Sequence, residues 1–278
     1  MSDFCAIDAT SVGSNEGVFS PRNFLNASSW SGSNQDLEGT TYSFYGYYPQ
    51  LTAPASTYTT LEGKGGVLLE VPAAQTGEFG RYQICSSSQV TMTKGDILKN
   101  KMVRFAFTPV TSLIRLRLTL SAATDKDIKE AYIKQVILEA KNSTANLTGG
   151  CFLTFADGKL ASTETAVNYK QIVVTLPSPV KITADKESNP YIDFVLLAAK
   201  GVNNITFDAR LQDNTKVSVA PQDAPAEGFA AGVRYTLDRS ITLTIDEDSD
   251  DSAYVDGGSA WDSNIDHDGF YTDAGYAW

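Results

Sequence analysis

VRFAFTPVTSLIRLRLTL, residues 103–120, carries the clearest strand pattern in the chain. Apolar and polar side chains alternate along it with a period of two, on both sides of Pro109. In the second half, two arginines and a threonine occupy one face, and the opposite face carries Ile114, Leu116, Leu118 and Leu120. Alternation of this length indicates two strands, each with one face in a core and one face near water.

The same pattern recurs along most of the chain. We expect further strands at residues 41–48, 67–71, 80–86, 133–139, 151–155, 171–176, 191–198, 205–211, 216–219, 233–237 and 241–245. Residues 191–198 are almost continuously apolar, which predicts a strand covered on both faces. Pro177 is expected to end the strand at 171–176, and residues 124–132 are expected to form a helical turn.

The expected fold is all-β, with little helix and two β-sandwich domains in tandem. We place the N-terminal domain at residues 1–145, of which 1–39 form a loosely ordered lead-in. The C-terminal domain is placed at 146–245, and residues 246–278 form an acidic linker and a strand-like tail. A chain of 278 residues suits two domains of this size.

The net charge of -11 is concentrated at one end of the chain. Residues 246–278 carry ten acidic residues and no Lys or Arg, whereas residues 1–245 carry 23 acidic and 22 basic residues. This distribution predicts no nucleic-acid partner, because such partners need clustered basic residues. A run of about 18 apolar residues is absent from the sequence, which predicts no membrane-spanning helix.

The three cysteines, Cys5, Cys85 and Cys151, lie far apart and form no metal-binding spacing. The favoured interpretation is that they are buried or idle thiols. A disulfide between Cys85 and Cys151 is the alternative.

His267 is the only histidine and lies in the acidic tail without an apolar frame, so we expect no enzyme and no cofactor. Asn264, Asp266 and Asp268, followed by Gly269, match the first half of a calcium loop. The twelfth position of that loop should be Glu and is Gly275. A solvated acidic segment is therefore favoured over a metal site.

The tail ends in GFYTDAGYAW, residues 269–278, which has the alternation of a strand. One face carries Phe270, Thr272, Ala274, Tyr276 and Trp278. Two interpretations stay open from the residues alone. The strand folds back onto its own domain as an edge strand, or it pairs with another molecule by β-augmentation.

Several segments, taken in their order along residues 41–237, resemble the fimbrillin family of Bacteroides-type pilin subunits. The first ones are YSFYGYYP from Tyr42, FAFTPVTSLIRLRL from Phe105 and IKQVILEAKNSTANLTGGCFLTFADGKL from Ile133. YIDFVLLA, ITFDARLQDNTK and FAAGVRYTL follow. Each segment alone is only a strand pattern, and the resemblance lies in their shared order.

The resemblance implies two transthyretin-like sandwich domains, a place on the cell surface in an outer-membrane fimbria, and assembly with other pilin subunits. It implies a lipoprotein precursor, whose signal segment is not present in this sequence. It also implies proteolysis after an arginine, for which Arg22 is the candidate, and removal of a first strand. Residues 270–278 would then be the donor strand. Ile114, Leu116, Leu118 and Leu120 would line the groove that receives it.

The alternative is that the chain is a surface module that binds a host protein or a glycan. One form of this alternative has calcium assisting the binding. Exposed aromatic residues such as Trp30, Tyr45 or Tyr47 would serve as the binding platform. Ordinary core filling is the simpler interpretation of these aromatic residues.

Overall fold

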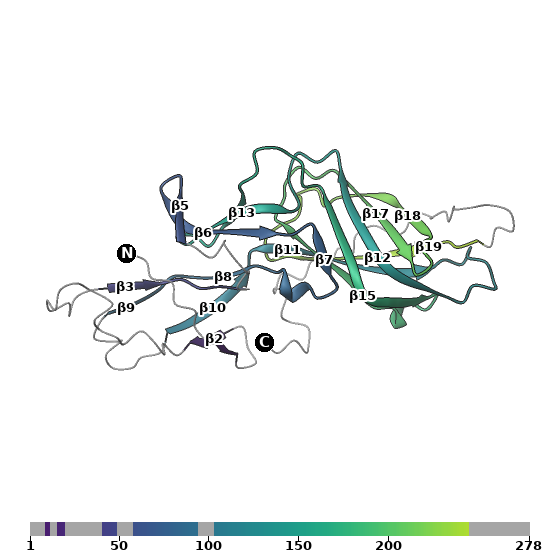
Figure 1. Cartoon of the computed structure of the whole chain (residues 1–278), viewed down its shortest axis with the longest axis horizontal. Helices are drawn as coiled ribbons and strands as arrows, with labels where there is room; N and C mark the ends of the chain where they lie inside the picture. Colours follow the sequence, from purple (N-terminus) through teal and green to yellow (C-terminus); the bar gives the residue numbers. More distant parts are fainter. Residues whose placement is uncertain (1–8, 12–15, 20–40, 49–57, 94–102, 245–278) are drawn as a thin grey trace.

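The computed structural model describes residues 9–11, 16–19, 41–48, 58–93 and 103–244 (Figure 1). Within these residues the chain forms β-strands and two short 3-10 helices, η1 (Phe79–Arg81) and η2 (Lys186–Ser188), and no α-helix. The expected all-β fold is confirmed. None of the helices in this part of the chain has the length and apolar character needed to cross a membrane.

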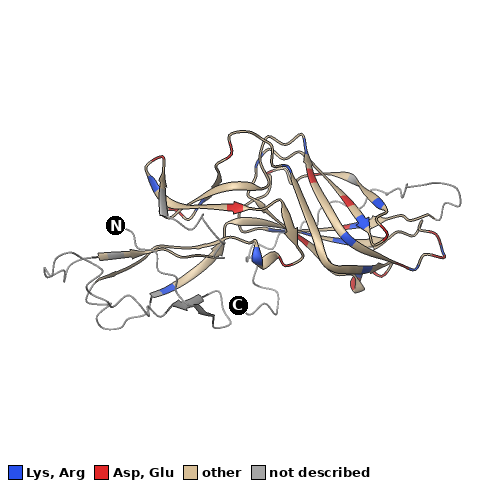
Figure 2. Ribbon diagram, in the orientation of Figure 1, with Lys and Arg blue, Asp and Glu red and all other residues tan. Residues whose placement is uncertain are grey.

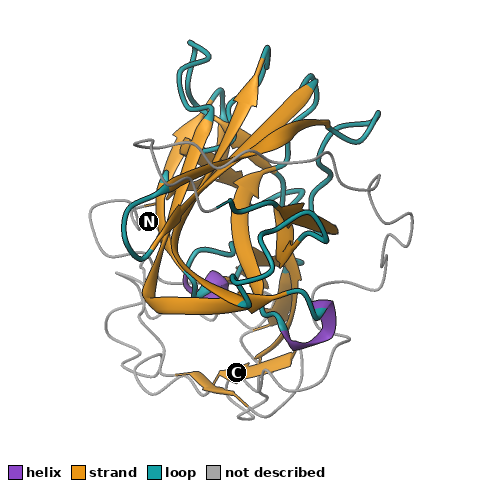
Figure 3. Cartoon of the chain, turned by 90° about the vertical axis from the view of Figure 1, so that its right-hand side faces the viewer, coloured by secondary structure: helices purple, strands orange, loops and turns teal. Residues whose placement is uncertain are grey.

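Two sheets form the main sandwich. The β12 sheet has the order β18 (Lys216–Asp223), β17 (Asn204–Leu211), β12 (Glu130–Lys141), β15 (Gln171–Thr183) and β7 (Ala74–Thr76). The β11 sheet has the order β16 (Tyr191–Leu197), β11 (Thr111–Leu120) and β19 (Arg234–Ile241). Seen along the long axis of the molecule, the strands face one another across a common interior (Figure 3).

The remaining strands form three smaller groups. The β6 sheet has the order β14 (Leu160–Ser162), β13 (Gly149–Thr154), β6 (Lys64–Val71) and β5 (Tyr58–Leu61). The β10 sheet has the order β1 (Ala9–Ser11), β2 (Glu16–Phe19), β10 (Val103–Pro109), β8 (Cys85–Ser87) and β4 (Tyr47–Tyr48). A separate pair consists of β3 (Thr41–Phe44) and β9 (Val90–Thr93). In Figure 1 the β10 sheet and this pair lie at one end of an elongated molecule, and the main sandwich lies at the other.

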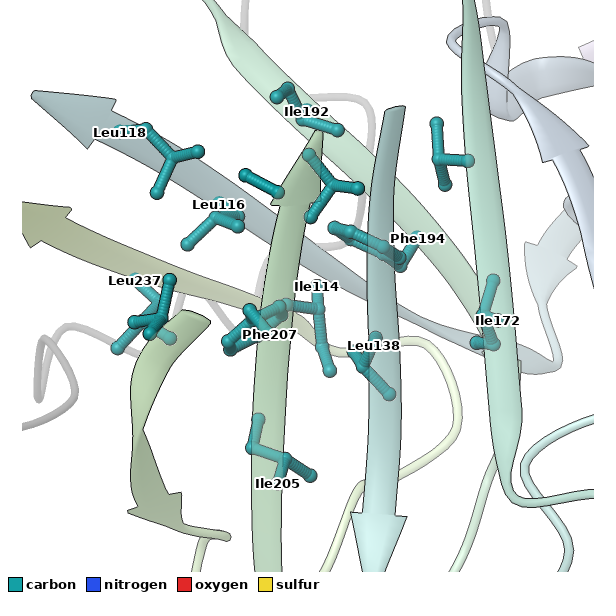
Figure 4. Close-up of a cluster of buried hydrophobic side chains, with 14 of the residues drawn as sticks. Ile114, Leu116, Leu118, Leu138, Ile172, Ile192, Phe194, Ile205, Phe207 and Leu237 are labelled. Atoms are coloured by element: carbon teal, nitrogen blue, oxygen red, sulfur yellow. The ribbon is translucent and has the colours of Figure 1, made fainter. Parts of the chain in front are cut away.

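Strand β11 lies between two hydrophobic cores. Ile114, Leu116, Leu118 and Leu120 point into the larger core, where they pack against residues of β12, β15 and β17 (Figure 4). Leu113 points the other way, into a second core formed with Val195 and with residues of β6 and β13. The β11 sheet is therefore the middle layer at this point, because the β6 sheet covers its outer face.

The expectation that the arginine face of β11 lies near water is wrong at Arg117, which is 8% exposed. Its Nε atom lies 2.9 Å from Oδ1 of Asp238 on β19. On the other side, Nε of Arg115 lies 2.9 Å from Oδ1 of Asp193 on β16. Both guanidinium groups lie over the ring of Tyr191, at 4.8 Å for Arg115 and 4.7 Å for Arg117. The pairing and the ring contacts offset the cost of removing these charges from water.

The predicted boundary between residues 145 and 146 does not separate two sandwiches in this structure. β11 and β12 precede residue 145, yet β11 pairs with β16 and β19, and β12 pairs with β15 and β17. The larger core needs strands from both sides of the boundary. The sequence does not reveal this arrangement, because strands that pair over a long sequence separation, such as parallel β11 and β19, leave no local signal.

Strand β15 continues through Pro177 and Pro179, so the expectation that Pro177 ends it is wrong. β15 pairs with β12 at Gln171–Thr175 and again at Val180–Thr183, with a register shift between the two. The two prolines fall in the interval without register partners. Proline is tolerated there because a bulge does not require its missing N–H.

The expected helical turn at residues 124–132 is also wrong in part, since β12 begins at Glu130 and the residues before it form turns without an α-helix. The strand expected at 233–237 is β19 (Arg234–Ile241), which continues to Ile241, whereas residues 242–244 of the strand expected at 241–245 form no strand. By contrast, the alternation of β17 and the burial of β16 are confirmed, with six of the seven residues of β16 buried.

Candidate assembly site

The candidate site is built around β10, whose two halves pair with different strands. Val103–Ala106 pairs in antiparallel register with Phe19–Glu16 of β2. Phe107–Pro109 pairs with Ser87–Cys85 of β8. β2 in turn pairs with β1 and so lies between β1 and β10. The N-terminal half of β10 therefore depends on β2 for its neighbour.

The core under this part of the chain is small. Among the described residues it has two buried members, Met92 and Phe105, with Phe44, Val90 and Phe107 packed partly buried against them. The rings of Phe105 and Phe107 lie 6.0 Å apart at a tilted angle. The larger core of the main sandwich has 29 buried members in the described residues. Within the described residues the β10 sheet thus has only a small core of its own, and a paired strand contributes a correspondingly larger share of its stability.

β2 lies just before the candidate cleavage site in the sequence. β2 ends at Phe19, and Arg22 follows three residues later. Arg22 itself lies outside the described residues. A chain break after Arg22 would leave β1 and β2 attached to the rest of the protein only through noncovalent contacts. Loss of β2 would expose the backbone N–H and C=O groups that β10 directs toward it, and an open strand edge readily pairs with another strand.

Comparison with known proteins gives structural matches only. No protein-family model matches the chain, and no curated protein matches it. A crystal structure from Bacteroides uniformis, described as a "putative cell adhesion protein", matches with a TM-score of 0.46 at 15% identity, over 72% of this chain and 67% of that one. A Bacteroides vulgatus structure, described as a fimbrial protein, matches with a TM-score of 0.46 at 13% identity, over 72% of each chain.

A further structure, from Bacteroides ovatus and again described as a "putative cell adhesion protein", matches with a TM-score of 0.44 at 14% identity. The match covers 72% of this chain and 62% of that one, so this chain spans less than two thirds of that protein. All these neighbours are Bacteroides proteins described as adhesion or fimbrial proteins, the class that the sequence resembles. With TM-scores below 0.5, these matches carry no functional inference for this chain.

The residues proposed to line a donor-strand groove lie in the main sandwich. The side chains of Ile114, Leu116, Leu118 and Leu120 are at most 5% exposed, and they pack against their own chain. They line no open surface in the described residues, so their burial does not support a role in a groove. The donor-strand residues Phe270, Thr272, Ala274, Tyr276 and Trp278 lie outside the described residues.

The aromatic residues considered as a binding platform take part in internal packing. The ring of Tyr45 stacks on that of Phe155, with centroids 5.0 Å apart. Tyr47 packs against the second core, and burial raises the pKa of its hydroxyl. Trp30 lies outside the described residues. These contacts favour core filling over a glycan-binding platform for Tyr45 and Tyr47.

Cys85 and Cys151 are buried and are not joined in a disulfide, which agrees with the favoured interpretation and not with the alternative. Burial, together with the charge of Glu70, raises the pKa of the Cys151 thiol to about 12. No cluster of metal-binding side chains occurs in the residues that the structure describes. Asn264, Asp266, Asp268 and His267 lie outside those residues.

The sequence does not indicate that β2 is the neighbour of β10. Polar and small residues dominate residues 1–39, which predicts a loosely ordered lead-in with at most one or two short strands. The available signal was the apolar pair Val18 and Phe19, shortly before Arg22. Two apolar residues are too few to indicate a strand by periodicity.

Proposed function

We propose that this chain is a structural subunit of a bacterial surface fimbria and that it assembles by strand exchange at β10. The observation that carries the proposal is the pairing of β2 with Val103–Ala106, immediately upstream of Arg22. In this account β2 covers the edge of β10 until proteolysis after Arg22 releases it. Residues 270–278 of another copy, or of a related subunit, then take its place.

Burial of the apolar face of the donor segment would drive the exchange. β2 contributes four residues of pairing to β10, whereas the donor segment has nine residues and a face of five apolar or small side chains. Burying several hundred Å² of that face is worth about 10 kcal/mol before ordering costs, at about 25 cal/mol per Å². Ordering costs reduce this value strongly, but a longer registered strand should still dissociate slowly.

The proposal also places the protein on the cell surface, as the resemblance to fimbrillins implies. Outer-membrane attachment through a lipoprotein precursor belongs to the same proposal. Among the described residues, Lys, Arg, Asp and Glu are interspersed along the strands and loops (Figure 2). This distribution of charge fits a structural role. Four of the seven ion pairs between described residues join neighbouring strands, as Arg115 does with Asp193.

Assembly experiments test the proposal with three forms of the full chain. An arginine-specific protease should cleave the wild type after Arg22, which N-terminal sequencing would show as a new start at Asn23. The cleaved protein should then form polymers in light scattering and electron microscopy. Arg22→Gln should stay intact at this position and monomeric. A chain that lacks residues 269–278 should be cleaved and stay monomeric.

The controls separate the two parts of the proposal. Mixing the cleaved, tail-deleted chain with a synthetic peptide of residues 269–278 should give a one-to-one complex, and a peptide of the same composition in scrambled order should not bind. Polymerisation of Arg22→Gln would refute release of β2 as the trigger. Polymerisation of the tail-deleted chain would refute the donor assignment.

A further inference from the structure

Strand β10 has a core face and a water face where it pairs with β2. Phe105 is 5% exposed and lies in the small core with Met92, whereas Arg104 and Ala106 are exposed. Successive residues of a strand point to opposite faces, and residues directly opposite each other on two paired strands share a face. A strand that pairs here therefore places the residue opposite Phe105 on the core face and the two residues beside it on the water face.

In β2 the residue opposite Phe105 is a glycine. Gly17 is the register partner of Phe105, and Glu16 is the register partner of Ala106. Directly opposite residues have Cβ atoms about 4.5–5.5 Å apart, so a large buried ring on one strand favours a small residue on the other. On the water face, the position of Glu16 is diagonal to that of Arg104, and opposite charges suit such neighbouring positions.

The donor segment offers one counterpart of Gly17. Its alternation gives one predominantly apolar face, which consists of Phe270, Thr272, Ala274, Tyr276 and Trp278. Of these, only Ala274 has a side chain of a single carbon. With Ala274 opposite Phe105 and the segment running in the direction of β2, residues 273–276 (DAGY) take the positions of residues 16–19 (EGVF). Both quartets start with an acidic residue, continue with a small one and end with an aromatic one.

Other registers fit these constraints less well. A shift of one residue exchanges the two faces of the segment and places Asp273 on the core face, where an unpaired carboxylate is costly. The quartet 268–271, DGFY, resembles β2 too, but in that register Asp273 again falls on the core face. A shift of two residues places Thr272 or Tyr276, both larger than alanine, opposite Phe105. The register with alanine at this position is the one that satisfies both faces.

We propose that Ala274 sets the register of the donor strand by pairing with Phe105 of the next copy. Asp273 then takes the position of Glu16, diagonal to Arg104. The inference rests on the proposed function, in which this segment replaces β2 on β10. It adds the residue that decides how the two strands align, and it makes β2 a stand-in whose pattern of residue types the donor repeats. An exposed charge pair contributes little affinity, so Asp273 acts mainly on the choice of register.

Disulfide trapping in the full chain measures the register, because the two Cα atoms of a disulfide lie within about 7 Å of each other. After cleavage, the double variant Ala106→Cys/Asp273→Cys should give a ladder of covalent polymers on a non-reducing gel. Ala106→Cys/Tyr271→Cys and Ala106→Cys/Gly275→Cys are the matched controls for shifts of two residues, and they should give no ladder. A ladder from either control, or polymers without a ladder in any variant, would overturn the register and leave the donor assignment standing. Failure of the wild type to polymerise would overturn the proposed function and the register with it.

A size substitution tests the role of Ala274 without new cysteines. Ala274→Leu should slow polymerisation of the cleaved chain at least tenfold, because the added carbons would meet the Phe105 ring in a filled site. Ala277→Leu makes the same change on the other face of the segment and should polymerise like the wild type. Adding Phe105→Leu to Ala274→Leu should restore part of the rate, which a general effect of leucine in the tail would not do. Equal rates for Ala274→Leu and Ala277→Leu would overturn the proposal.

Discussion

Leu113 and Ile114 are neighbours on β11, yet their side chains lie in two different hydrophobic cores. Ile114 is fully buried between the β11 and β12 sheets, and Leu113 is buried between the β11 and β6 sheets. Because successive side chains of a strand point to opposite faces, one strand here joins two packed layers. The β6 sheet is therefore attached to the main sandwich through the first residues of β11 and the last residues of β16.

Alanine substitutions at these two residues should destabilise the two cores independently of each other. Ile114→Ala and Leu113→Ala should each lower the free energy of unfolding by about 2–5 kcal/mol, because each leaves a cavity in a packed core. Amide exchange should rise mainly in β12 and β17 for Ile114→Ala, and mainly in β6 and β13 for Leu113→Ala. The same exchange pattern for both variants would show that the two cores unfold as one unit.

Asp238 should make stability depend on pH. Burial acts to raise the pKa of this carboxyl group, but hydrogen bonds from Arg117 and Lys186 outweigh it and hold the pKa below the ordinary value of 3.8. A group whose pKa is lower in the folded state stabilises the fold above its unfolded pKa. This contribution is lost as pH falls below about 4 and through the lowered pKa.

Denaturant unfolding at neutral and acid pH measures this effect. Asp238→Asn should be less stable than the wild type at pH 7, and the difference should shrink as pH falls. Glu187→Gln is the control, because the Glu187 side chain is 79% exposed and lies 3.4 Å from Arg117. An exposed pair of this kind contributes little. A difference for Asp238→Asn that does not change with pH would contradict the assignment.

The two buried cysteines should be inert in the folded protein. The thiolate is the reactive form of cysteine, and the pKa of Cys151 is raised to about 12, so almost no thiolate forms at pH 8. Peptide mapping after iodoacetamide treatment should find Cys85 and Cys151 unmodified in native protein and modified in denaturant. Rapid modification of the native protein, or recovery of a Cys85–Cys151 disulfide, would contradict the structure.

Phe105 should matter for the β10 sheet and little for the main sandwich. In the part of the chain that the structure describes, it is one of two buried residues in the small core there. Phe105→Ala should therefore increase amide exchange in β8, β9 and β10, with little change in β12 or β17. Phe207→Ala, in the larger core, is the matched comparison and should raise exchange across the main sandwich.

Local patterns in the sequence were enough to predict individual strands. The alternation on both sides of Pro109 gives β10 and β11, and the apolar run at 191–197 gives a strand covered on both faces. Interactions between distant residues were not predictable in this way. Arg117 is buried because Asp238 and Tyr191 meet it from two other strands. Pro177 is tolerated because the opposite strand shifts register, and β2 carries too few apolar residues to stand out.

Hydrogen exchange at β10 shows whether the C-terminal segment can replace β2. The chain should carry a specific protease site in place of residues 20–23, so that only this position is cut. We predict that amides of Val103–Ala106 are protected in the intact chain, lose protection when the segment before the introduced site is cut off and removed, and regain it with the peptide of residues 269–278. Continued protection after removal, or no recovery with the peptide, would contradict the account.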